Sequence, residues 1–239
     1  MALALGIIVA LPTEASVLTR QSITQHLPVS LTKNVTLIVC GMGSANAEQA
    51  AQLHIKQGVT ALLSFGTAGG INPECKAGDI IVADSGIDND GHKISIDTNW
   101  QQKVFNTLKL AKSQKVISGP ICESTLVVAS SADKQKLFET SNALAVDMET
   151  VALARISQKH QIPFISLRVI VDPADMTIPF VVTNNMDENG NVSIIKLLVG
   201  LLKRPGNIFP LIQLAKNFSK ARKAMVICKD VLGIEFLQV

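Results

Sequence analysis

The sequence contains no tyrosine and a single tryptophan, and its net charge of +3 is small for 239 residues. Proteins that bind single-stranded nucleic acid stack bases on aromatic side chains, and basic residues neutralise the phosphates. The chain has little of either feature. We therefore expect no nucleic-acid partner.

Cysteine is also sparse, and Cys40, Cys75, Cys122 and Cys228 lie far apart with no CxxC pair. This spacing does not predict metal ligation, so we expect buried cysteines that behave as small apolar groups. A cytoplasmic location fits such a composition. No metal or organic cofactor is expected.

Long uncharged segments are missing too. No run of about 18 uncharged apolar residues occurs, so we expect no membrane-spanning helix. The apolar segment 1–11 has no basic residue and leads directly into Pro12-Thr13-Glu14. This arrangement favours a first β-strand over a signal peptide.

What the sequence does contain is an alternation of two patterns, with 47% apolar residues. Runs rich in β-branched residues predict strands at Leu3–Ala10, Val35–Cys40, Thr60–Phe65, Asp79–Ala83, Val116–Cys122, Leu126–Ala129, Leu144–Asp147 and Phe164–Val171. Helical patterns cover Ala45–Lys56, Asn99–Ser113, Ala132–Glu139, Met148–Lys159, Val192–Lys203 and Phe209–Met225. We expect an α/β fold in which helices flank a mostly parallel sheet, built as one domain over residues 1–239.

Acidic residues follow three of the apolar runs: Glu14 follows Leu5–Leu11, Glu149 follows Ala143–Val146, and Asp172 follows Phe164–Val171. Open α/β sheets bind ligands in the crevice beyond the carboxyl ends of their strands. These three carboxylates are therefore candidate functional groups.

Two glycine-rich segments also follow predicted strands. Gly41-Met42-Gly43-Ser44 precedes a helix, and such a turn either presents backbone amides to an anion or is a plain connector. Gly66-Thr67-Ala68-Gly69-Gly70 allows a close approach of the backbone to a ligand, or it forms a tight bend in a curved sheet.

Four segments occur in the order and spacing of a known family: Gly6–Glu14, Gly66–Gly70, Val146–Glu149 and Arg168–Asp172. The chain resembles the superfamily of purine nucleoside phosphorylases and methylthioadenosine/adenosylhomocysteine nucleosidases. Within it, Val171–Asp175, Ile178-Pro179 and Leu201–Pro205 resemble the hopanoid-associated phosphorylase-like proteins, which are thought to remove adenine from adenosylhopane.

The resemblance implies a three-layer fold, in which helices flank a twisted mixed sheet that closes into a partial barrel, and assembly into dimers or larger homo-oligomers. It implies cleavage of the N-glycosidic bond of a purine nucleoside. Asp172 matches the acid that protonates N7 of the departing purine. The apolar neighbours of Asp172 favour its protonated form. The alternatives are that Asp172 caps the next segment of the chain or pairs with Arg168.

The resemblance also assigns residues around the sugar. Glu149 matches the residue that holds the ribose hydroxyls, and its charge would stabilise a cationic sugar. Met148 would pack under the ribose. Thr67, Ala68 and the amide of Gly69 would line the side from which the nucleophile attacks. A helix-start role for Glu149 is the alternative.

The nucleophile is water or phosphate. Hexameric phosphorylases of this superfamily place arginines around the phosphate, where this chain has Glu14 and Ser64. A carboxylate repels a phosphate dianion but is suited to take a proton from water, so we predict hydrolysis with Glu14 as the general base. Phosphorolysis, with inorganic phosphate as co-substrate and with Arg20 or a partner subunit supplying a cation, remains open.

The predicted purine pocket has Val127-Val128 where the nucleosidases have Phe-Ile, so an aromatic face is lost. A large apolar 5′ substituent, as in a lipid-linked nucleoside, would offset that loss. Two other functions remain as alternatives, a methylthioadenosine/adenosylhomocysteine nucleosidase and a non-catalytic, membrane-associated nucleoside-binding module. A dinucleotide-dependent oxidoreductase is disfavoured because Asn46 replaces the third glycine of the fingerprint.

The C-terminal part carries one sign of charge. Residues 189–229 include no acidic residue, and basic and apolar residues alternate over 192–225. This pattern predicts basic amphipathic helices, which either contact a membrane surface or pack on the core with a solvated basic face.

Overall fold

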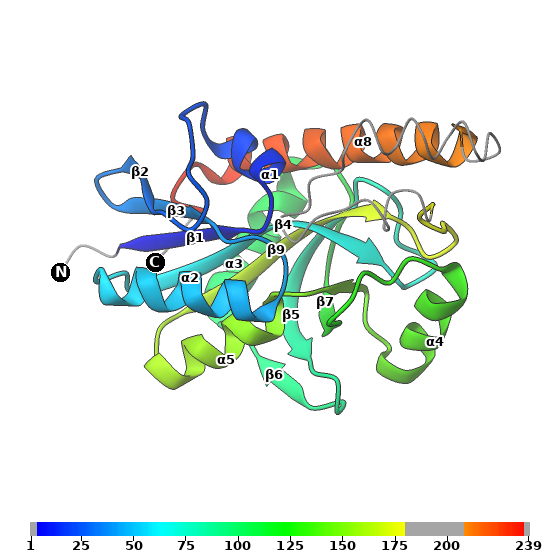
Figure 1. Ribbon diagram of the computed structural model, residues 1–239, viewed down its shortest axis with the longest axis horizontal. Helices are drawn as coiled ribbons and strands as arrows, with labels where there is room; N and C mark the ends of the chain where they lie inside the picture. Colours follow the sequence, from blue (N-terminus) through cyan, green and yellow to red (C-terminus); the bar gives the residue numbers. More distant parts are fainter. Residues whose placement is uncertain (1–3, 180–207, 237–239) are drawn as a thin grey trace.

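The computed structural model describes residues 4–179 and 208–236 (Figure 1). Within these residues, nine strands form one mixed sheet. The strands are β1 (Leu5–Val9), β2 (Val29–Thr32), β3 (Val35–Val39), β4 (Ala61–Gly70), β5 (Ile80–Ile87), β6 (Lys93–Ser95), β7 (Val116–Glu123), β8 (Ala145–Asp147) and β9 (Phe164–Asp172).

The sheet closes partly on itself. Its strand order is β2-β3-β1-β4-β8-β7-β5-β6, and β9 pairs in parallel with β4 and antiparallel with β5. Strands β4, β8, β7, β5 and β9 therefore form a closed ring. The predicted mixed sheet and partial barrel are confirmed.

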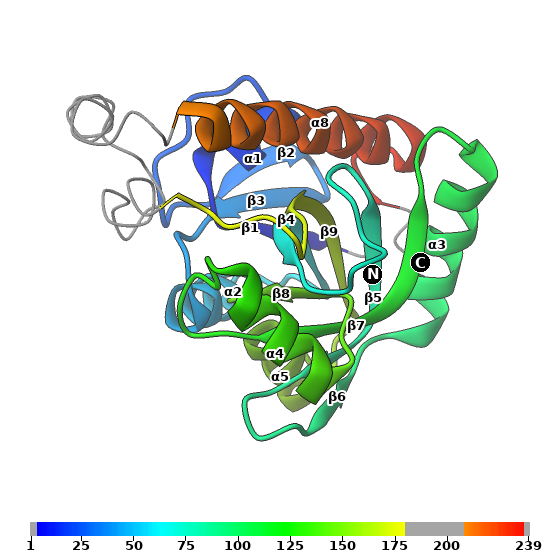
Figure 2. The same ribbon diagram turned by 90° about the vertical axis from the view of Figure 1, so that its right-hand side faces the viewer.

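Helices cover the sheet on both sides. The described helices are α1 (Pro12–Leu18), α2 (Ser44–Lys56), α3 (Thr98–Ala111), α4 (Ser131–Ser141), α5 (Thr150–His160) and α8 (Ile208–Leu232). Figure 2 shows α8 along one side of the sheet, with α4 and α5 on the opposite side. Helices α2 and α5 pack together, and α8 packs on β9, α1 and α3.

The core consists mainly of the β-branched and aliphatic residues of the strands. In β1, β3 and β9, most of these side chains are buried, because strands of a largely parallel sheet face helices on both sides. All four cysteines are free and buried, as predicted. Among residues 4–179 and 208–236, no helix combines the length and the apolar character that crossing a bilayer requires.

The strand predicted at Leu126–Ala129 is wrong. Strand β7 ends at Glu123, and the hydroxyl of Ser124 then donates to the carbonyl of Leu126 and accepts from its amide, which turns the chain. Leu126 is 76% exposed and belongs to an irregular segment.

Strand β4 is longer than predicted. It continues through the glycine-rich segment to Gly70, with a register shift against β9 between Ala68 and Gly69. The segment is therefore a curved strand and not a loop.

The C-terminal helix α8 packs its apolar side on the molecule. Ala221, Ala224, Met225 and Cys228 are buried, whereas the basic side chains Lys216, Lys220, Arg222 and Lys223 are exposed. Helix α8 thus packs on the core through these buried residues and exposes its basic side chains. The helix predicted at Val192–Lys203 lies outside the described residues.

Candidate active site

A cavity of about 600 Å³ lies at the carboxyl ends of β1, β4 and β9. Every residue that the sequence suggested for the site contributes to its wall: Glu14, Thr67, Ala68, Gly69, Val127, Val128, Met148, Glu149 and Asp172. These residues come from five separate segments of the chain, and helix α8 contributes further residues to the wall. The catalytic roles of these residues remain proposals.

Glu14 sits in the first turn of α1 and is 3% exposed. Its Oε2 accepts hydrogen bonds from the amides of Ala10 and Leu11 at 3.1 and 3.0 Å. Its Oε1 accepts from the amide and the hydroxyl of Thr67 at 2.7 and 2.8 Å. Burial raises the pKa of Glu14, while Arg168 and these hydrogen bonds oppose the shift.

Gly66 makes this position of Glu14 possible. A Cβ atom at residue 66 would lie 2.7 Å from Oε1 of Glu14, closer than a carbon and an oxygen can approach. The absence of a side chain at Gly66 in β4 therefore lets the carboxylate of Glu14 approach the strand closely.

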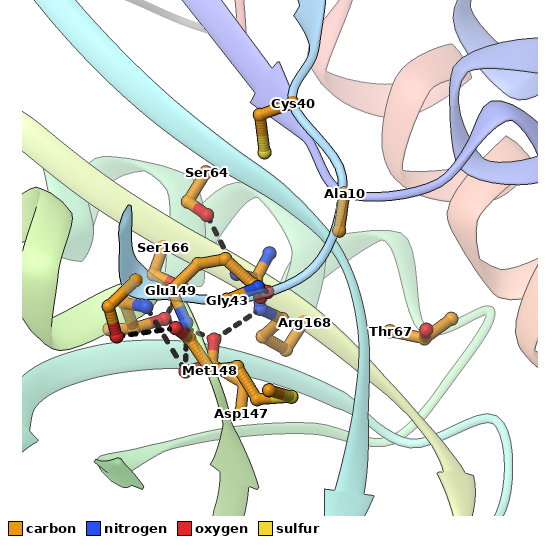
Figure 3. A network of polar contacts seen from close by, with 12 residues as sticks. Ala10, Cys40, Gly43, Ser64, Thr67, Asp147, Met148, Glu149, Ser166 and Arg168 are labelled. Carbon is orange, nitrogen blue, oxygen red and sulfur yellow. Dashed lines mark hydrogen bonds and ion pairs between the residues drawn. The ribbon is translucent and has the colours of Figure 1, made fainter. Parts of the chain in front are cut away.

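Arg168 on β9 belongs to a network of polar contacts with Ser64, Asp147 and Glu149 (Figure 3). Its Nε donates to Asp147 at 2.6 Å, and its Nη2 donates to the hydroxyl of Ser64 at 2.7 Å and lies 3.5 Å from Oε2 of Glu149. Asp147 also accepts from the Thr150 hydroxyl. The Arg168 side chain is 3% exposed, and its Nε and Nη2 contact protein groups.

Glu149 also closes the first glycine turn. The amide of Gly43 donates to its Oε1 at 2.8 Å, so the turn does face an anion, and that anion is a side chain of the protein itself. Burial and then the charge of Asp147 raise the pKa of Glu149 to about 7, while Arg168 opposes the shift. Glu149 is thus able to titrate near neutral pH.

Asp172 ends β9 and is 4% exposed. It does not pair with Arg168. Its Oδ2 lies 2.6 Å from Nζ of Lys134, a fully buried lysine in the first turn of α4. Burial raises the pKa of Asp172 to about 6, and Lys134 holds it below the value that burial alone would give.

A sequence model of one family matches residues 4–198, and its description is the phosphorylase superfamily. The chain belongs to the phosphorylase superfamily. Membership confirms the family that the four sequence segments indicated.

Curated members of the phosphorylase superfamily resemble the chain at moderate identity. A 5′-methylthioadenosine/S-adenosylhomocysteine nucleosidase from Baumannia cicadellinicola subsp. Homalodisca coagulata is 28% identical over 160 residues, which cover 60% of this chain and 70% of the relative.

Solved structures of the phosphorylase superfamily share the fold. The nucleosidase of that name from Neisseria meningitidis, in complex with methylthio-immucillin-A, has a TM-score of 0.69 at 19% identity, covering 98% of this chain and 99% of the other. The futalosine hydrolase of Helicobacter pylori has a TM-score of 0.68 at 19% identity, covering 96% and 98%.

One wall of the cavity is apolar. Helix α8 contributes Leu211, Leu214, Ala215 and Phe218, and Leu126 and Ile178 extend this wall beyond Val127 and Val128. Among the described lining residues there is no lysine or arginine. The lining of the cavity thus combines a few carboxylates with many apolar side chains.

The sequence did not predict the partners that the structure gives to Lys134 and Arg168. Lys134 was only part of a predicted helix. Arg168 was only an alternative partner of Asp172. A signal for Arg168 existed, since a charged residue inside an apolar strand run requires a buried counter-charge. For Lys134, the sequence around it reads as an ordinary exposed helix face.

Proposed function

We propose that the protein hydrolyses the N-glycosidic bond of a purine nucleoside and releases adenine. One observation carries the proposal: a single cavity gathers the carboxylates of Glu14, Glu149 and Asp172, and no lysine or arginine among the described residues lines it. The named activities of the relatives support the same reaction class.

Asp172 acts on the purine. A purine anion is a poor leaving group, so bond cleavage is assisted when the carboxylic acid donates its proton to N7 while the bond between C1′ and N9 breaks. The pKa of about 6 gives Asp172 a protonated fraction near neutral pH. After the step, Asp172 is a carboxylate and adenine is neutral.

Glu149 acts on the sugar. As the bond breaks, positive charge develops at C1′ and the ring oxygen, and a buried carboxylate stabilises that charge more strongly than it would in water. The second oxygen of Glu149, which lies 3.5 Å from Arg168, would accept from the ribose hydroxyls. Met148, the neighbouring residue in the cavity wall, would pack under the ring.

Glu14 acts on the nucleophile. Water adds to C1′ and gives a proton to the carboxylate of Glu14, so the products are adenine and the free 5′-substituted ribose. For this step one hydrogen bond of Thr67 to Oε1 must be replaced by the water molecule. A phosphate dianion would instead meet three carboxylates, with Arg168 already occupied by Asp147 and Ser64.

The apolar side chains that line the cavity favour a nucleoside with an apolar 5′ substituent. Burial of apolar surface contributes about 25 cal/mol per Å², so a tail packed along Leu211, Leu214 and Phe218 would compensate for a purine that lacks an aromatic partner. Adenosylhopane is our candidate substrate, in the formation of hopanoid side chains.

Contact with a lipid surface belongs to the same proposal. Phe209 and Ile212 are 82% and 47% exposed at the start of α8, next to the apolar wall and to exposed Lys216. Such residues would reach the interface of an anionic membrane and let a lipid-linked nucleoside pass into the cavity. Co-sedimentation with anionic and with neutral vesicles tests this contact.

The decisive experiment measures adenine release from adenosylhopane, methylthioadenosine, adenosylhomocysteine and inosine, with and without inorganic phosphate. We expect adenosylhopane to react fastest and phosphate to have no effect. A strict phosphate requirement would establish phosphorolysis instead. Faster turnover of methylthioadenosine would overturn the apolar-tail assignment, and no base release from any nucleoside would leave a binding module.

A further inference from the structure

The described lysine with the least exposure touches the proposed catalytic acid. Lys134 is 0% exposed, although lysine is almost never fully buried without a partner. Its Nζ lies 2.6 Å from Oδ2 of Asp172 and donates to the carbonyls of Asp172, Pro173 and Met176 at 3.1, 2.9 and 2.9 Å. The ammonium group is thus enclosed by oxygen atoms.

These contacts tie α4 to the chain that follows β9. The amide of Ile178 donates to the carbonyl of Ala129, and the amide of Ser131 donates to the hydroxyl of Thr177. Together with Lys134 they fix residues 172–178 against the start of α4, next to the cavity wall that contains Val127 and Val128.

The lysine occupies only one oxygen of the acid. Oδ2 is taken by the ammonium group, and Oδ1 accepts no hydrogen bond from another of the residues described. When one oxygen of a carboxylic acid is anchored, the O–H group on the other oxygen keeps a fixed direction. Proton transfer is sensitive to that direction.

We propose that Lys134 is a positioning residue for Asp172: it anchors Oδ2 and residues 172–176, so that Oδ1 delivers the proton to the purine. The inference rests on the proposed function. Lys134 does not line the cavity and acts on the reaction only through Asp172.

The positive charge of Lys134 also lowers the pKa of Asp172. Among the described charged side chains, Lys134 is the one that shifts the pKa of Asp172. The nearby carboxylates Glu14 on α1 and Glu149 before α5 instead raise the pKa of Arg168 on β9. An opposite charge at this distance lowers the pKa of an aspartate by about 1 to 3 units. Removing it would keep Asp172 protonated to a higher pH.

The test compares Lys134→Met with Lys136→Met, which removes the same charge from an exposed position on α4. For Lys134→Met we expect a fall in kcat of about 100-fold with little change in KM. We also expect the alkaline limb of the pH profile to move up by about 1 to 3 units. Lys136→Met should match the wild-type protein. A folded Lys134→Met variant with the wild-type kcat and pH profile would overturn the proposal.

Lys134→Arg covers the case in which the methionine variant does not fold. It keeps the charge, but its larger planar head cannot keep the same contacts, so kcat should fall while the alkaline limb stays in place. An arginine variant with wild-type kcat would contradict the positioning role.

A carbon-13 NMR titration of Asp172 in the wild-type and variant proteins separates this inference from the proposed function. If the wild-type protein releases no purine, the proposed function fails, whereas a higher pKa of Asp172 in Lys134→Met still supports the pairing. An unchanged pKa in a folded variant refutes the pairing whatever the activity.

Discussion

Replacing Glu149 by glutamine removes one buried charge and keeps the size of the side chain. The pKa of Glu149 is raised from 4.5 to about 7, by burial first and by Asp147 second. Between these two values the folded protein holds a proton that the unfolded chain has lost. The free energy of unfolding therefore decreases as the pH rises through this window, and this contribution is constant below and above it.

The size of the effect follows from the shift. A change from 4.5 to about 7 is about 2.5 units, and at about 1.36 kcal/mol per unit it amounts to about 3 kcal/mol. The residue is only 7% exposed, so little of this energy is screened by solvent. Domains are stable by about 5–15 kcal/mol, so the difference is large enough to measure.

Urea unfolding, followed by tryptophan fluorescence, measures this difference in the free energy of unfolding. Trp100 is the single tryptophan, is 2% exposed and donates to the carbonyl of Phe236 at 2.8 Å, so its emission reports on the loss of the core. The stability of the wild-type protein minus that of Glu149→Gln should fall by about 3 kcal/mol between pH about 4 and about 8. Glu48→Gln, at an exposed position on α2, is the control. A difference that does not change with pH would refute the reasoning.

Three further outcomes follow from the site. Asp172→Asn should lower kcat for adenine release by about 10² to 10⁴-fold, because the amide cannot give up a proton in this way; a near-normal rate would remove the acid assignment. Gly66→Ala should lower kcat by about 100-fold, since its Cβ would displace Glu14; unchanged turnover would show that the position of Glu14 is unimportant. The alkaline limb of kcat should lie at higher pH than that of kcat/KM, because the bound purine excludes water from Asp172; coincident limbs would contradict this.

The strands were the most predictable part of the fold, because the Val- and Ile-rich runs of β1, β3 and β9 are buried at nearly every position and are stable only inside a sheet covered on both faces. Strand β4 was cut short in the prediction at Phe65, since glycine disfavours strands. The structure shows why the glycines are tolerated there. Gly66 and Gly69 face the carboxylates of Glu14 and Asp172, where a Cβ would lie 2.7 and 3.3 Å from the nearest oxygen.

Elements that depend on partners distant in the sequence escaped prediction. Helix α1 has only seven residues, and Glu14 in its first turn is held by Thr67, which lies 53 residues later in the chain. Lys134 acquires its buried position only when α4 meets a segment 38 residues later in the chain. Lysine is exposed by default, so no local pattern predicts such a partner.

The two raised pKa values bear on how a nucleoside would prepare the proposed site. In the free protein, burial raises the pKa of Asp172 to about 6 and that of Glu149 to about 7. The proposed mechanism requires a protonated Asp172 and an ionised Glu149. Ribose hydroxyls that donate to Glu149 would favour its charged form, and a purine that removes water from Asp172 would favour the neutral form. Lys134 opposes the protonation of Asp172 in the free protein. Under the proposal, the bound nucleoside would therefore itself bring both carboxyl groups into the charge states that its cleavage requires.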